Sequence, residues 1–182
     1  MRKSGYVFGI ALLMAASLYL LPALQAADEP VLDSPEVSEL LTQARSYALQ
    51  LRDDADVMHK FSLMSLSWES HASQISTIKE HVNNLGKVLD EMADRHKWSS
   101  PWQQDAIDRI TPLARELASN IETTIEHINN NQGRLHTPEY KGYLRANYEV
   151  SSSLSKMIGD YVSYGKNRAD FHRLGEKLEV AH

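Results

Sequence analysis

The chain has 182 residues and a formal net charge of −5, and no block of Lys or Arg occurs in it. Nucleic-acid binding, which requires a basic face, is therefore not expected. The absence of Cys excludes disulfides, thiolate zinc sites, attached c-type haem, a lipid-modified N-terminal Cys and Cys nucleophiles. A Cys-free domain must be stable through its hydrophobic core alone, and the roughly 155 residues that would remain after removal of an N-terminal signal peptide can supply one.

The first 26 residues are typical of a secretory signal peptide. Arg2 and Lys3 give a short positive region, an apolar stretch follows over 6–21, and Pro22 then precedes a group of small residues. Cleavage after Ala26 would leave a mature domain without a membrane span. The sequence therefore predicts a periplasmic or secreted protein.

Cleavage after Ala26 would also make residues 27–34 a short linker. Leu24 departs from the expected pattern, because the position three residues before the cut is usually small. The alternative is an uncleaved membrane anchor, since residues 6–24 approach the length that spans a bilayer. We favour cleavage, because Pro22 and the alanines lie where processing needs them.

Three short motifs place a hydroxyl residue before Pro and predict helix starts. They are Ser34-Pro35, Ser100-Pro101 and Thr137-Pro138. Ser or Thr at the N-cap accepts a hydrogen bond from a free backbone N–H group. Pro at the first helical position loses no hydrogen bond, because its missing N–H would have no partner there. Helices are therefore expected to begin at these three prolines.

Apolar residues spaced by three and four, as in a coiled-coil seam, predict helices over about 35–66 and about 70–97. The second stripe is the cleaner and runs through Ile75, Ile78, Val82, Leu85, Leu89 and Met92. Leu85 lies midway along it and is expected at the centre of the core, with Asn84 facing outward. The stretch between the two helices lacks Gly and Pro, so only length places a turn there. The alternative is one helix of about sixty residues.

A third helix is predicted over 101–131. Pro112 lies within it and should bend it, because Pro lacks an N–H group and crowds the carbonyl four residues before it. The Asn and Gly residues over 129–133 suit a left-handed cap at the end of this helix.

A fourth helix is predicted over 138–179. Gly165 should weaken it, and Phe171, Leu174 and Leu178 indicate that it resumes to the end of the chain. No segment alternates apolar and polar residues for long enough to predict a strand. Four helices of similar length with short loops indicate an all-α fold, an antiparallel up-down-up-down four-helix bundle over 35–182.

Met92 and His96 lie four residues apart and would share one helix face. In this topology His172 would lie at the same end of the bundle, and the three side chains could bind copper or haem iron. The simpler interpretation is that Met92 belongs to the core and that His96 is a positive group at the negative end of a helix dipole. We favour the simpler interpretation and expect no metal site and no cofactor.

Four other histidines are expected near the opposite end of the bundle. They are His59, His71, His127 and His136. Their grouping is compatible with a metal site. Most of them are nevertheless expected to be solvated or at helix ends, because sequence spacing fixes the facing of a side chain only loosely.

No catalytic motif is present. A ferritin-like di-iron site needs Glu-x-x-His on two helices, and the nearest approach is a single Asp56 to His59 spacing. The chain has no Gly-x-Ser-x-Gly, no His-Glu-x-x-His and no Gly-rich phosphate loop. These observations predict that the protein is not an enzyme.

The fourth helix carries five tyrosines that cannot all point into one narrow stripe. They are Tyr140, Tyr143, Tyr148, Tyr161 and Tyr164. Some of them should be exposed or line a groove, where the apolar ring and polar tip of Tyr suit binding. We therefore predict an exported helical bundle that binds a protein or a small molecule, with the copper- or haem-binding bundle as the alternative.

Overall fold

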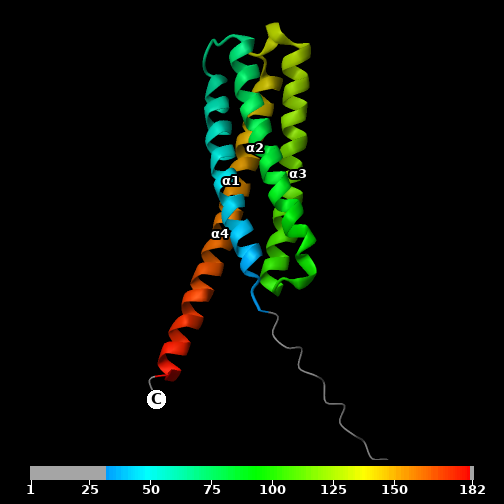
Figure 1. Ribbon diagram of the computed structural model, residues 1–182. Helices are drawn as coiled ribbons and strands as arrows, with labels where there is room; N and C mark the ends of the chain where they lie inside the picture. The colour runs from blue at the N-terminus through cyan, green and yellow to red at the C-terminus, as the bar shows by residue number, and fades with distance from the viewer. Residues whose placement is uncertain (1–31, 181–182) are drawn as a thin grey trace, which may run out of the picture.

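The computed structural model describes residues 32–180 and consists of helices and short turns (Figure 1). The signal peptide predicted over 1–26 and most of the linker predicted over 27–34 lie outside the described residues. The four long helices are α1 (Pro35–Phe61), α2 (Trp68–Asp94), α3 (Pro101–Asn130) and α4 (Pro138–Val180). Two short 3-10 helices, η1 (His96–Trp98) and η2 (Gln132–Arg134), lie in the connections around α3. Residues 32–180 form no strand, so the predicted all-α fold with four helices is confirmed.

Each helix packs against the next one in the chain, and α4 also packs against α1. At one end of the bundle, the Nε2 amide of Gln103 at the start of α3 donates to the carbonyl of Ser34 before α1, at 2.8 Å. The later part of α4 lies at this same end, where Arg168 pairs with Asp33 at 3.1 Å. At the other end, His71 near the start of α2 contacts Tyr140 near the start of α4.

The three hydroxyl-Pro motifs begin helices as predicted. Ser34 Oγ accepts from the Val37 N–H at 3.2 Å, and Thr137 Oγ1 accepts from the Tyr140 N–H at 3.4 Å. The backbone N–H of Ser100 donates to the Gln103 side chain at 3.1 Å. Each contact satisfies a backbone donor that an unflanked helix start would leave free.

The connection between α1 and α2 spans residues 62–67, so α1 ends earlier than the sequence predicts and one continuous helix is excluded. α2 also ends earlier, at Asp94, and His96 lies in η1. The left-handed cap expected after the third helix is wrong, because Asn131 has φ −138° and ψ 43°. α3 continues through the exposed Pro112, and α4 continues through Gly165.

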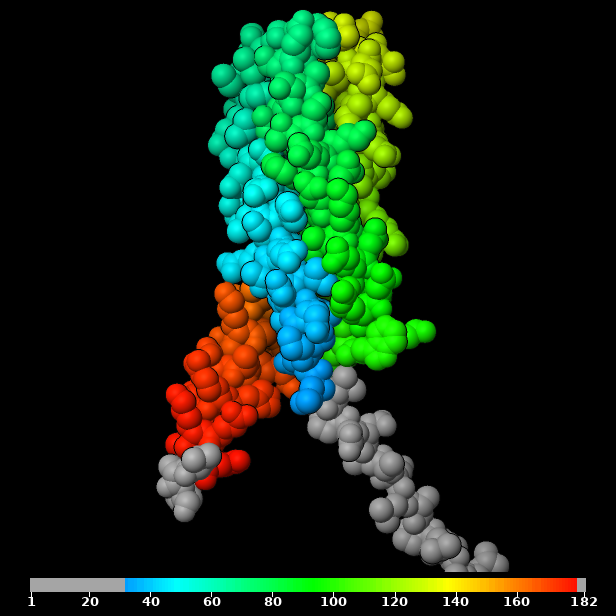
Figure 2. All heavy atoms as spheres, in the orientation of Figure 1, coloured from blue at the N-terminus to red at the C-terminus, as the bar shows by residue number. Residues whose placement is uncertain are grey.

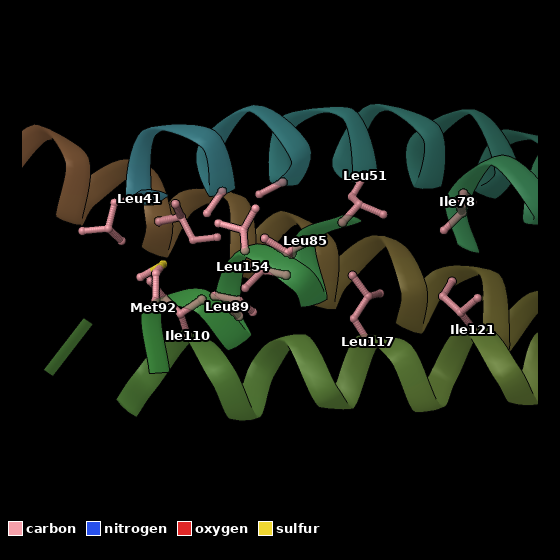
Figure 3. Packing of buried hydrophobic residues seen from close by; sticks show 14 of the residues in the cluster. Leu41, Leu51, Ile78, Leu85, Leu89, Met92, Ile110, Leu117, Ile121 and Leu154 are labelled. Carbon is pink, nitrogen blue, oxygen red and sulfur yellow. The ribbon is translucent and has the colours of Figure 1, made fainter. Parts of the chain in front are cut away.

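The hydrophobic core is built from the inward stripes of all four helices (Figure 3). Leu85 is 1% exposed and lies at the centre of the core, as predicted. Asn84 is half-buried and does not face fully outward. Toward the end of the bundle that holds the connection between α1 and α2, the interior also contains polar side chains, and the amide of Asn147 donates to Thr124 Oγ1 at 2.9 Å.

α4 is the longest helix, with 43 residues, and its last turns run past the end of the bundle (Figures 1 and 2). We call residues 169–180 the α4 extension. Its last tie to the bundle is the ion pair between Arg168 and Asp33. The side chains over 169–179 are exposed, apart from the half-buried Gly175.

Candidate functional site

A groove of about 720 Å³ runs between α3 and α4 near the end of the bundle from which the α4 extension leaves. We call it the α3–α4 groove. α3 contributes Trp102, Asp105 and Arg109, and α4 contributes Ser153, Lys156, Met157, Asp160, Tyr161 and Tyr164. The α4 residues recur every three or four positions and so share one face of the helix. Its volume lies within the range of about 300–1,000 Å³ that is usual for small-ligand sites.

Trp102 forms the end wall of this groove and is held in place from three sides. Its indole N–H donates to Asp33 Oδ1 at 2.7 Å, and the second oxygen of Asp33 pairs with Arg168. Tyr164 meets the indole edge to face, with 5.3 Å between ring centroids. A Cβ atom at Gly165 would come within 2.8 Å of the indole ring. Glycine at this position therefore lets the tryptophan lie directly against the α4 backbone.

The charged groups of the groove neutralise one another in pairs. Asp105 pairs with Arg109 along α3 at 2.8 Å, and Lys156 pairs with Asp160 along α4 at 2.6 Å. The Tyr161 hydroxyl crosses the groove and donates to Asp105 at 2.5 Å. These pairs place both signs of charge around a floor that contains Met157.

The pKa values of Asp105 and Tyr161 shift in opposite directions, and the hydrogen bond between them contributes to both shifts. The donated hydroxyl, followed by the Arg109 guanidinium, holds the pKa of Asp105 below its ordinary value. Burial first, and then the Asp105 carboxylate, raises the pKa of Tyr161 to about 12. Near neutral pH the tyrosine is a donor and the aspartate an acceptor. This arrangement offers polar contacts to a ligand but no poised base or nucleophile.

A second group of side chains lies inside the opposite end of the bundle and combines histidine with aromatic rings. His71 is 2% exposed, and its Nδ1 lies 2.8 Å from the hydroxyl of Tyr140. Phe61 meets the His71 ring edge on, at 5.2 Å. The His127 ring stacks on Tyr140 with 5.2 Å between centroids, and His59 stacks on Tyr148 with 5.6 Å. We call this group the His–Tyr cluster.

Burial shifts the pKa values of two members of the His–Tyr cluster, His71 and Tyr140. It lowers the pKa of His71 and raises the pKa of Tyr140. Both groups are therefore neutral near pH 7, and one hydrogen bond joins them. The ring atoms His59 Nδ1 and His127 Nε2 are buried without a hydrogen-bond partner. Aromatic stacking is thus the main contact of these two imidazoles.

The four histidines lie at helix ends or in a loop, as expected: His59 and His127 are in the last turns of α1 and α3, His71 is in the first turn of α2, and His136 is exposed in the loop before α4. Only His71 is fully buried. His59 and His127 are half-buried. Two groups that the sequence presents separately, the histidines and the tyrosines of α4, pair with each other in space.

Met92, His96 and His172 do not come together. Met92 is fully buried in the core near Leu41 and Ile110 (Figure 3). His96 lies in η1 because α2 ends before it, and its Nε2 lies 3.0 Å from Asp108. His172 is exposed on the α4 extension, beyond the bundle. The simpler interpretation of Met92 as a core residue is therefore the one that its position supports.

Tyr161 and Tyr164 were among the residues expected to line a groove, whereas Trp102, Asp105 and Arg109 were not identified from the sequence. The four-residue spacing of Asp105 and Arg109 indicates only an ion pair on the surface of a helix. Which helix lies opposite this ion pair depends on the packing of the bundle, which the spacing does not indicate.

No protein-family model, curated protein or solved structure matches the chain. Over residues 32–180, no three His, Cys, Asp or Glu side chains gather closely enough to hold a metal ion. In the same range, no helix combines the length and the hydropathy that a membrane crossing requires.

Proposed function

We propose that this protein is an exported, non-enzymatic bundle of up-down-up-down topology that binds an amphipathic ligand in the α3–α4 groove. The observation that carries this proposal is the groove itself, in which Met157 and three aromatic side chains lie beside charged groups of both signs. An apolar body with a charged group matches this surface. The apolar body of the ligand would displace water from the rings of Trp102 and Tyr164. Its charged group would take the place of one partner in an ion pair of the groove.

Two further observations support binding without catalysis. The groove wall is preorganised, because Asp33 and Gly165 hold Trp102 in one position before any ligand arrives. Preorganised walls reduce the entropy lost on binding. The four charged groups of the groove and the Tyr161 hydroxyl are bound to one another, so none of them is set to transfer a proton. A turnover that depended on Asp105 or Tyr161 would contradict this part of the proposal.

The chain contains a natural set of reporters for a binding test. It has three tryptophans, and only Trp102 lines the groove. Trp68 lies at the start of α2, and Trp98 lies in η1 and is 72% exposed. The probe is anilinonaphthalene sulfonate, which has an aromatic body and one negative charge. Its effect on the three indole N–H signals is followed by two-dimensional NMR of the ¹⁵N-labelled protein.

We expect the probe to shift the Trp102 signal and to leave the Trp68 signal in place. Met157→Glu should weaken this response at least tenfold, because it puts a carboxylate in the apolar floor and repels the sulfonate of the probe. The matched control is Ala118→Glu, which adds the same charge in the separate hollow between α2 and α3. Equal shifts at all three indoles, or equal effects of the two glutamates, would refute the groove as the site.

Export and cleavage are tested by measuring the mass of the protein that is recovered from its host after secretion. Cleavage after Ala26 predicts a mature chain that begins at Ala27. An intact Met1 in a membrane fraction would instead support the retained anchor over residues 6–24.

A further inference from the structure

We infer that a second copy of this chain covers the outer face of the α4 extension, with the two extensions antiparallel. The face in question carries Phe171, Leu174 and Leu178, which we call the outer stripe. Their exposed fractions are 76%, 56% and 69%. They recur at intervals of three and four residues, which is the spacing of a helix-pairing seam.

The outer stripe is not a continuation of the buried face of α4. Inside the bundle α4 buries Leu154, Ile158 and Val162. The same face of the helix continues through Gly165, Ala169, His172 and Glu176, which are small or polar. At 100° per residue, Phe171 and Leu174 lie about 140–160° around the helix from Ile158. An apolar stripe on this side cannot be reached by α1 or α2 of the same bundle.

The outer stripe instead continues the face of α4 that lines the α3–α4 groove. Phe171 and Leu178 follow Tyr164 at steps of seven residues, so they lie within about 20–40° of it on the helix surface. α3 covers this face only as far as its own start at Pro101. Beyond that point the face has no neighbour within residues 32–180, so it is open to a partner from another molecule.

The charges beside the outer stripe favour a second copy in antiparallel orientation. Asp170 and Lys177 are seven residues apart and flank the stripe on the same side. When two such helices pair in opposite directions, Phe171 of each lies against Leu174 of the other. Asp170 of each then lies near Lys177 of the other, which gives two opposite-charge pairs. In a parallel pair, Asp170 of each helix would instead face Gly175 of the other, and the two opposite-charge pairs would be lost.

A membrane surface is a poorer match for the extension. Anionic lipids select helices with a strongly basic polar face. Over residues 166–179 the basic side chains are Lys166, Arg168, Arg173 and Lys177, and the acidic ones are Asp170, Glu176 and Glu179. The two signs nearly balance, as expected for a surface that pairs with itself.

The expected dimer is weak and depends on concentration. The α4 extension is about 18 Å long at 1.5 Å per residue. Such a contact buries less than the 1,200–2,000 Å² that is typical of stable interfaces. We therefore expect monomer and dimer to exchange in the micromolar range or above, and the dimer to disappear on dilution.

The test is sedimentation velocity over a hundredfold range of concentration, with the full chain as the exporting host processes it. We expect reversible dimerisation in the unmodified protein. Leu174→Glu should raise the dissociation constant at least tenfold, because it puts one carboxylate from each chain into the apolar seam. The circular dichroism and melting temperature of this variant should stay close to those of the unmodified protein, since Leu174 makes no core contact.

Orientation is tested by exchanging charges. Asp170→Lys should weaken the dimer at least tenfold, because it replaces two attractive pairs with two repulsive ones. The double variant Asp170→Lys with Lys177→Asp should restore the original affinity, because the same pairs re-form with their signs reversed. Failure of this rescue would overturn the antiparallel register.

Three other results would overturn the proposal as a whole. They are a chain that stays monomeric at every concentration, a dimer that Leu174→Glu leaves unchanged, and a monomer that floats with vesicles of anionic phospholipid. The ligand test at Trp102 does not depend on self-association. Failure of the dimer can therefore be distinguished from failure of the groove.

Discussion

The two parts of α4 differ in what surrounds them, although they form one continuous helix. Within the bundle, Leu144, Leu154 and Ile158 are at most 1% exposed. In the α4 extension, side chains of the same kind are mostly exposed. The difference shows that apolar spacing determines which side chains share a face, whereas neighbouring helices determine whether that face is buried.

This contrast separates stability from recognition. Burial of apolar area stabilises the fold by about 25 cal/mol per Å², so the bundle part of α4 should carry most of the folding free energy of this helix. The outer stripe contributes little to the folded monomer and is free to bind. The predictions that follow test this separation, beginning with the largest effect.

Leu85→Ala should give the largest loss of stability. Leu85 lies at the centre of the core, and its truncation removes burial and leaves a cavity, at a cost of about 2–5 kcal/mol. Asn84→Ala is the control on the neighbouring position and should cost under about 1 kcal/mol, because Asn84 is only half-buried. Urea unfolding measures both changes. Equal midpoints for the two variants would contradict the placement of α2 in the core.

Tyr140→Phe should lower stability by about 1–3 kcal/mol, because it leaves a buried ring nitrogen of His71 without its partner. The control is Tyr143→Phe. It removes a hydroxyl that donates to the exposed Glu139 at 2.9 Å, and it should change stability by less than about 0.5 kcal/mol. If both variants unfold at the same urea concentration, the hydrogen bond inside the His–Tyr cluster is not a significant source of stability.

The stability of the bundle should fall as the pH drops below about 6.5, the ordinary pKa of histidine. Burial lowers the pKa of His71 in the folded state, so in this range the unfolded chain binds a proton that the folded chain does not. The unfolded state is then favoured progressively until the pH reaches the folded-state pKa. Comparison of unfolding free energies at pH 8 and pH 5.5 measures the effect.

His71→Gln supplies the control for this pH dependence, because the glutamine amide is able to bond to Tyr140 but does not titrate. The stability difference between the original protein and the variant should therefore narrow as the pH falls. A difference that stays constant from pH 8 to pH 5.5 would show that His71 does not titrate as its burial requires.

The sequence predicts those features that depend on neighbours along the chain. The three hydroxyl-Pro starts, the core position of Leu85 and the four-helix count follow from capping and periodicity. The end of the first helix was placed too late, because Ser62 and its neighbours contain no Gly or Pro to mark a stop. The cap at Asn131 also differs, since its N–H bonds back to His127 without a left-handed residue.

The groove and the His–Tyr cluster depend on contacts between distant parts of the chain. Asp33 holds Trp102 across 69 residues of sequence, and His71 meets Tyr140 across the same separation. Spacing within one helix carries no information about such pairs. The separation of His96 from His172 has a similar cause, since it follows from where α2 stops and from how far α4 runs past the bundle.

Leu174→Ala should have the smallest effect of all, and it tests the contrast within α4 most directly. It is the same substitution as Leu85→Ala, made at a leucine that is 56% exposed. In dilute solution, where the chain is monomeric, it should change the unfolding free energy by no more than about 0.5 kcal/mol. At high protein concentration the original protein should have the larger unfolding free energy, because only the original gains stability from dimerisation. Urea unfolding at two protein concentrations a hundredfold apart measures this difference. If Leu174→Ala destabilised the dilute protein as much as Leu85→Ala does, the extension would have to pack against its own bundle, and the outer stripe would not be available to a second copy.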